Sequence, residues 1–177
     1  MKKLLFLACI LVITASCSSV KVSSDFDKTA GFASYKTYAF TPEALGLPLD
    51  DINRNRVLGA IETELAAKGF TKNETSPDVL IDVTIKGEQK QTATATNTGG
   101  YGYGRYGYGG GFSTTTINYE TYVDGTMFID MIDASKKQLV WQGRGTKTIE
   151  PDASQKKREE NINYAVKQIF LQYPPKI

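Results

Sequence analysis

The segment PDVLIDVTIK, residues 77–86, alternates apolar and polar side chains with the two-residue period of a β-strand. Its branched apolar residues share one face: Val79, Ile81, Val83 and Ile85. The opposite face carries the polar residues Asp82, Thr84 and Lys86. A strand with one apolar face needs a second layer to cover it, so the segment predicts a sheet that packs against helices.

A second strand is predicted within residues 127–132. Its two faces are both apolar, with Met127, Ile129 and Met131 on one and Phe128 and Ile132 on the other. This pattern predicts a central strand that is buried on both sides. The turn DASKK, residues 133–137, then leads into Leu139-Val140-Trp141 and predicts a hairpin. We expect Trp141 in the core or at its rim rather than as a platform for a ligand.

Two amphipathic helices are predicted to form the covering layer. The first is capped by Asp50 or Asp51 and ends before Gly69, where a helix C-cap is expected. Its apolar stripe consists of Val57, Leu58, Ile61 and Leu65. The second is capped by Asp152 or Ser154 and is stopped by Pro174-Pro175. Its apolar face consists of Ile162, Val166, Ile169, Phe170 and Tyr173.

The N-terminal part of the domain completes the predicted order of elements. Residues 25–40 read as strand, turn and strand, broken at Gly31, and residues 41–49 read as a loop. The order is then β-β-α-β-β-β-α. The fold class is α+β: a two-layer sandwich with a mainly antiparallel sheet and both helices on one face. We expect one domain over residues 25–177, preceded by a polar tether at 17–24.

The first 16 residues have the three-part pattern of a secretory signal peptide. Met1-Lys2-Lys3 is a short positive region, and LLFLACILVI, residues 4–13, is an apolar run too short to span a bilayer. Thr14-Ala15-Ser16-Cys17 then resembles a lipobox, the recognition site of bacterial lipoprotein maturation. Its first position usually holds an aliphatic residue, and Thr14 departs from that pattern.

The lipobox predicts that the chain is cleaved before Cys17 and that this thiol carries the acyl chains, palmitate among them, that anchor it. The alternative is a plain signal peptide whose cleavage site lies beside a cysteine. An Asp directly after the acylated cysteine is an inner-membrane retention signal in some bacteria, and none follows Cys17. No acidic cluster that would resemble a surface-export signal comes next. The expected location is therefore the outer membrane, facing the periplasm.

Composition excludes several classes of function. Two of the 21 basic residues lie in the leader, so the remaining 19 balance 19 acidic residues. A neutral domain lacks the basic surface of a nucleic-acid binder, and no nucleic-acid partner is expected. The chain has no histidine, which removes Ser–His and Cys–His nucleophiles and the usual zinc sites. We expect no cofactor and no metal.

The segment GGYGYGRYGYGGG, residues 99–111, is the low-complexity stretch of the chain. It lacks the Gly-Lys-Ser/Thr ending of a phosphate loop. It predicts the flexible tip of a long hairpin. One interpretation is a solvent-exposed tip that has no binding role. The other is a contact surface for an envelope protein or cell-wall glycan. The candidate contact residues are Tyr101, Tyr103, Arg105, Tyr106 and Tyr108.

Several segments together resemble the DUF4136 family, lipoprotein domains of unknown function. They are DFD at 25–27, Phe32 with YKTYAF at 35–40, LAAKGF at 65–70, PDVLI at 77–81, YVDGTMFIDMID at 122–133, LVWQG at 139–143 and YPP at 173–175. The resemblance implies an α+β domain attached to the cell envelope. It assigns no catalytic or binding residues.

The acidic pairs are the remaining candidates for chemistry, since glycosidases work with two carboxylates across a cleft. The pairs are Asp50/Asp51, Glu159/Glu160 and Asp130 with Asp133. We expect the first two at helix starts and the third around a hairpin turn, all in structural roles. The sequence thus favours a non-enzymatic binding or accessory lipoprotein. A carboxylate-based envelope hydrolase and a purely structural lipoprotein are the alternatives.

Overall fold

The computed structural model describes residues 20–99 and 113–175. Its strands are β1 Lys21–Phe26, β2 Thr37–Phe40, β3 Thr71–Lys72, β4 Val79–Gly99, β5 Ser113–Asp133 and β6 Gln138–Thr148. Its α-helices are α2 Pro42–Leu45, α3 Asp51–Ala67 and α4 Gln155–Phe170. A 3-10 turn, η1, covers Phe32–Ser34. The predicted α+β class is correct.

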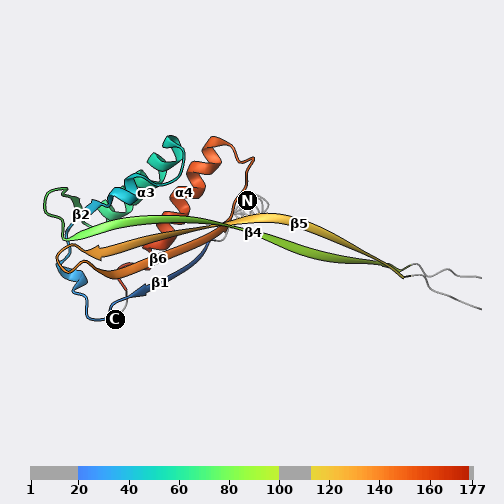
Figure 1. Cartoon of the computed structure of the whole chain (residues 1–177), viewed down its shortest axis with the longest axis horizontal. Coiled ribbons are helices and arrows are strands. Elements are labelled where there is room, and N and C mark those ends of the chain that lie inside the picture. The colour runs from blue at the N-terminus through green and yellow to red at the C-terminus, as the bar shows by residue number, and fades with distance from the viewer. Residues whose placement is uncertain (1–19, 100–112, 176–177) are drawn as a thin grey trace, which may run out of the picture.

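The six strands form one sheet in the order β1-β6-β5-β4-β2-β3. The pairs β1/β6, β6/β5 and β5/β4 are antiparallel, whereas β2 runs parallel to both β4 and β3. Helices α3 and α4 lie side by side over one face of this sheet (Figure 1). The molecule therefore has two layers, one of helices and one of strands.

The two long helices begin and end where the sequence indicates. The side chain of Asp50 caps α3 by accepting from the backbone N–H of Asn53 at 2.9 Å. The Ser154 hydroxyl caps α4 in the same way by accepting from the backbone N–H of Lys157, so the N-cap is Ser154 and not Asp152. Gly69 follows α3 with a positive φ of 83°, a conformation that glycine adopts without strain. Both apolar stripes face the sheet and meet its buried residues, Trp141 among them.

In the first half of the domain, strand β1 starts earlier than predicted, and the short elements α2 and β3 were not predicted. Strand β1 begins at Lys21, so residues 21–24, predicted as tether, pair with β6 instead. Helix α2 lies within the predicted loop, and Pro42 at its start suits the first turn of a helix. Strand β3 has only two residues, too few to give an alternating pattern.

The prediction that β5 is buried on both faces is wrong. The strand is central, and Ile129 and Met131 are fully buried under the helices. On the opposite face, Phe128 and Ile132 remain half-buried, because the helices cover one side of the sheet only.

Strands β4 and β5 continue far beyond the other strands as an antiparallel ribbon (Figure 1). Their register is unbroken from Val79 opposite Asp133 to Gly99 opposite Ser113. Strand β6 accompanies β5 only as far as Asp124. We call residues 89–99 and 113–123, which lie beyond that point, the ribbon. The predicted Gly/Tyr tip falls almost wholly outside the described residues.

Candidate functional site

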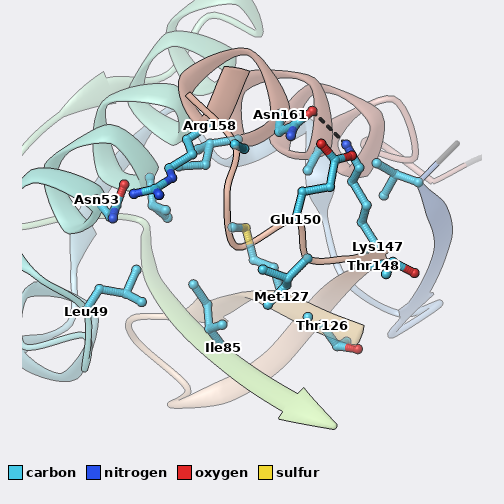
Figure 2. A pocket seen from close by; sticks show the side chains of 18 residues that line it. Leu49, Asn53, Ile85, Thr126, Met127, Lys147, Thr148, Glu150, Arg158 and Asn161 are labelled. Carbon is cyan, nitrogen blue, oxygen red and sulfur yellow. Dashed lines mark hydrogen bonds between the residues drawn. The ribbon is translucent and has the colours of Figure 1, made fainter. Parts of the chain in front are cut away.

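A cavity of about 280 Å³ lies where the helix layer ends and the ribbon begins. Figure 2 shows Ile85 and Met127 rising from the sheet into it, with Leu49 at one side. The helices contribute Val57 from α3 and Ile162 from α4. The buried residues of α3 begin at Val57 and those of α4 at Val166, so the first turns of both helices contribute no fully buried side chain.

The charged residues of the cavity come from the end of β6, the loop after it and the first turns of α4. The Lys147 ammonium donates to Asn161 Oδ1 at 2.6 Å, as the dashed line in Figure 2 shows. Burial lowers the pKa of Lys147, an effect that Glu150 partly offsets. The guanidinium of Arg158 donates to the carbonyl oxygen of Pro151 at 3.0 Å. In the described part of the chain, neither cation lies within 4.0 Å of a carboxylate.

The cavity wall also includes Val20, the first described residue. Val20 lies three positions beyond Cys17, the predicted acylation site. A chain of three residues spans at most about 11 Å. The cavity is therefore within that reach of the predicted anchor.

The ribbon has two faces of different character, which follow from its register. One face pairs Ala93 with Tyr119 and Ala95 with Ile117. These four residues are all exposed, Tyr119 at 69% and Ile117 at 52%. We call them the apolar ribbon face. Since side chains alternate along a strand, this face continues the side of the sheet that carries Ile85 and the cavity.

The opposite face of the ribbon is polar. It pairs Thr92 with Glu120 and Thr94 with Asn118. At the root of the ribbon, Asp124 accepts from the Lys90 ammonium at 2.9 Å and from the Thr148 hydroxyl at 2.8 Å. These contacts tie the ribbon to the last residue of β6, and beyond them no third strand pairs with its described residues.

Among the predicted acidic pairs, Asp50 and Asp133 have the structural roles that were expected of them. Asp133 accepts from the backbone N–H groups of Ser135 and Lys136 in the β5–β6 turn, both at 2.9 Å. The first turn of α4 contains no acidic residue, so Glu159 and Glu160 do not lie at its start as predicted. Glu160 instead pairs with Lys156 one turn earlier, at 4.0 Å.

Asp130 does not belong to the turn. It points to the open face of the sheet, directly opposite Asp82 on β4, and accepts from the Gln142 amide at 2.8 Å. Burial raises the pKa of Asp130, the Gln142 hydrogen bond opposes that shift, and Asp82 adds to it. Neither aspartate lines the 280 Å³ cavity. The sequence pattern missed this pair because it depends on the register between two strands.

The other predicted site residues lie outside the described residues. They are Cys17 and the tip residues Tyr101, Tyr103, Arg105, Tyr106 and Tyr108. Over the ranges 20–99 and 113–175, no group of three or more Cys, Asp or Glu residues is placed to hold a metal ion. Over those same ranges, no helix has the length and hydropathy needed to cross a membrane.

The family resemblance is confirmed over nearly the whole chain. The model of DUF4136, a domain of unknown function, matches residues 22–175. No curated protein matches the sequence.

The solved structures that match at low sequence identity include the following three. A PDZ domain protein from Parabacteroides distasonis has a TM-score of 0.55 and 19% identity. That match covers 89% of this chain but 36% of the other, so the chain spans about a third of that protein's length. Two dodecamers of PelC from Paraburkholderia phytofirmans, one of them a point variant, have TM-scores of 0.47 and 0.44 and 11% identity. Those matches cover 86% of this chain and 96% and 95% of PelC, and their scores are too low to carry an argument.

Proposed function

Since the chain belongs to the DUF4136 family, whose function is unknown, we propose that it is a lipid-anchored binding module of the bacterial envelope that acts without catalysis. In this proposal Cys17 carries the anchor and the ribbon meets the partner. The expected location is the outer membrane, on its periplasmic side.

The ribbon is the observation that carries the binding part of the proposal. A two-stranded ribbon is marginally stable in water, because each strand has one partner and neither face is covered. This one nevertheless keeps Ile117 and Tyr119 exposed on a single face. Neighbouring apolar side chains on an exposed face are typical of a surface that another molecule covers.

The chemistry of the ribbon favours a protein partner. Its outer edges offer unpaired backbone groups to an added strand, and the apolar ribbon face offers a surface on which that partner can pack. A cell-wall glycan is the second candidate, through the tyrosines of the predicted tip. A nucleic acid does not fit, since the domain after the leader is neutral.

Photo-crosslinking in intact cells tests the partner surface. A photoreactive residue at Tyr119 should yield a discrete crosslinked product, and the double change Ile117→Ser with Ala95→Ser should remove it. The matched control replaces Asn118 and Thr94 by Ser on the polar face, and the product should persist. If the control abolishes the product equally, or if no product forms, the ribbon is not the binding surface.

Deleting residues 99–111 separates the predicted tip from the rest of the ribbon. Loss of the product with the shortened hairpin would assign recognition to the tip tyrosines. Retention of the product would assign it to the apolar ribbon face. Either result keeps the binding module, whereas an intact protein that yields no crosslinked product from any ribbon position would favour a purely structural lipoprotein.

The anchor has its own test. Cys17→Ala should abolish metabolic labelling of the protein with a palmitate analogue and leave the protein uncleaved or soluble. Persistent labelling in the variant would contradict lipidation at this residue, and a cleaved but unlabelled wild-type protein would support the plain signal peptide.

A further inference from the structure

The 280 Å³ cavity at the root of the ribbon combines an apolar interior with cations, and this combination defines a class of ligand. Its size is close to the lower end of about 300–1,000 Å³ that is usual for small-molecule sites. Met127 and Val57, both buried, and the half-buried Ile85 line its interior. An interior of this kind removes an acyl chain from water but offers little to a sugar or nucleotide.

The cations in the lining favour a ligand that carries a negatively charged group. Lys147 and Arg158 both line the cavity, and neither forms an ion pair within the described ranges. Glu150 is the one carboxylate in the lining, which leaves an excess of one positive charge. Lys147 is held in place by Asn161, so its remaining N–H groups can donate to an anion without rearrangement.

A simple anion would use the cations and leave the apolar interior empty. A neutral hydrocarbon would fill the interior and leave both cations without an anion. An amphiphile with an anionic head satisfies both parts of the site, and a cavity of about 280 Å³ is suited to one acyl chain rather than two. We propose that the cavity binds a single-chain fatty acid, with the acyl chain against Met127 and Ile85 and the carboxylate at Lys147, while Arg158 on the opposite side adds to the positive charge of the lining.

This inference does not depend on the partner-binding function, and it concerns a free fatty acid rather than the acyl chains on Cys17. The test therefore uses residues 18–177, which contain every described element but no acylated cysteine. Decanoate is the probe, and its binding is measured by isothermal titration calorimetry. Acetate provides the head group without the chain, and decyltrimethylammonium provides the chain with the opposite charge.

We expect saturable binding of decanoate and no comparable binding of acetate or decyltrimethylammonium. Lys147→Gln should weaken decanoate binding about tenfold, the effect of losing one charge-assisted hydrogen bond. Arg158→Gln should have a smaller effect, because the Arg158 guanidinium points toward Asn53 and away from Lys147 (Figure 2). The matched control Lys167→Gln removes an exposed cation from the same helix as Arg158 and should leave the affinity unchanged.

The interior is tested by filling it. Ala165→Phe places a ring in the cavity and should abolish decanoate binding, whereas Ala66→Phe, at an exposed position of α3, should not. If Ala165→Phe fails to fold, as judged by its thermal transition, Ala153→Leu fills the same cavity from the loop before α4.

Three outcomes would overturn the proposal. Acetate binding as tightly as decanoate would indicate a plain anion site. Decyltrimethylammonium binding as tightly would indicate an apolar surface without charge selection. Absence of decanoate binding to the folded protein would show that the cavity does not bind this ligand. The partner-binding function would still be decided separately by the crosslinking experiment.

Discussion

At the scale of single residues, Asp133 joins the β5–β6 turn to the start of the domain. Its carboxylate accepts from the Ser135 hydroxyl at 2.7 Å and from the Tyr35 hydroxyl at 2.9 Å. Hydrogen bonds from Ser135 and the backbone N–H of Lys136 lower the pKa of Asp133 to about 2, although burial opposes them. Burial, followed by the bond to Asp133, raises the pKa of Tyr35 to about 12.

Asp133→Asn should therefore destabilise the protein in a pH-dependent way. The folded pKa lies below the unfolded value, so the carboxylate stabilises the fold at pH values above about 3.8 and loses this effect as the pH falls through about 2. The cost at pH 7 should be about 1–3 kcal/mol, because buried donors lose their acceptor. Urea unfolding at pH 7 and pH 2.5 should show the difference from wild type shrinking at the lower pH. Asp152→Asn, at an exposed position, should show no such dependence.

Asp130→Asn should have the opposite effect. Burial raises the folded pKa of Asp130, so its ionised form costs folding free energy at neutral pH, and this cost disappears as the pH falls below about 3.8. An asparagine keeps an acceptor for Gln142 and removes repulsion by Asp82. We expect a gain on the order of 0.2–1 kcal/mol at pH 7, the range for one cross-strand pair. A loss of stability in urea titrations at pH 7 would contradict this assignment.

The two aspartates illustrate what can be predicted about single residues. The turn role of Asp133 follows from its neighbours in the sequence, Ser135 and Lys136, and the prediction was correct. The environment of Asp130 depends on Asp82 and Gln142, which belong to other strands. The pattern within one strand does not reveal which residues of the neighbouring strands lie opposite it, so the prediction that Asp130 belongs to the turn was wrong.

At the scale of elements, the packing of α4 on β6 depends on two glycines that remove side chains from the sheet surface. A Cβ atom on Gly143 would lie 2.4 Å from Ile169 Cγ2 and 2.4 Å from the Trp141 ring. One on Gly145 would lie 2.9 Å from Ile169 Cδ1. The helix can therefore approach the strand closely along the line of Ile169.

Gly143→Ala should consequently destabilise the domain by about 1–3 kcal/mol, the usual cost of overpacking a core. Gly59→Ala is the matched control, because it makes the same change inside α3 where no atom lies within 4 Å. That change should stabilise the protein by about 0.5–1 kcal/mol, since glycine is unfavourable within a helix. Thermal unfolding measures both, and equal shifts would contradict the close packing of α4.

The ribbon is the element that the sequence describes least well. Apolar alternation in β4 ends after Ile85, yet the strand continues to Gly99. Residues 88–98 are mainly polar and Thr-rich, so they give no strand signal based on burial. Pairing with β5 extends the strand instead, and the same pairing creates the apolar ribbon face from Ala93, Ala95, Ile117 and Tyr119. The cavity was likewise not predicted, because its lining comes from separate strands, helices and loops.

Amide hydrogen exchange should separate the two halves of β4. Residues 79–85 lie in the part of the sheet that the helices cover, whereas residues 91–98 lie in the ribbon, where β5 is the one strand paired with them among the described residues. The amides of the outer half should exchange much faster in the isolated protein, since local opening there breaks few contacts. Equal protection along the whole strand would contradict an unsupported ribbon. Addition of a true partner should slow exchange in the outer half selectively.

At the scale of the whole molecule, the start of the domain and the root of the ribbon lie at the same end of the sheet. Lys21 pairs with Thr146, and two residues later Thr148 pairs with Asp124 at the ribbon root. The β5–β6 turn lies at the other end, after Asp133. Asp133 lies nine positions after Asp124, which corresponds to about 30 Å of strand.

A lipid anchor at Cys17 would therefore hold one end of the sheet near the membrane. Four residues separate Cys17 from Lys21, so the tether adds at most about 14 Å. The ribbon root and the cavity would then lie close to the bilayer, and the β5–β6 turn would lie farther away. This orientation would give the cavity direct access to membrane-derived fatty acids.

Fluorescence quenching by nitroxide-labelled lipids tests that orientation. A fluorophore on Glu88→Cys, at the ribbon root, should be quenched more strongly than one on Lys136→Cys, in the β5–β6 turn; both positions are exposed. A Cys17 thiol that carries an acyl chain would not react with the fluorophore, so each variant would have a single site. The same variants made as residues 18–177, without the predicted anchor, should show no quenching at either position. Stronger quenching at Lys136 in the anchored protein would place the opposite end of the sheet at the membrane and separate the cavity from its proposed source of ligand.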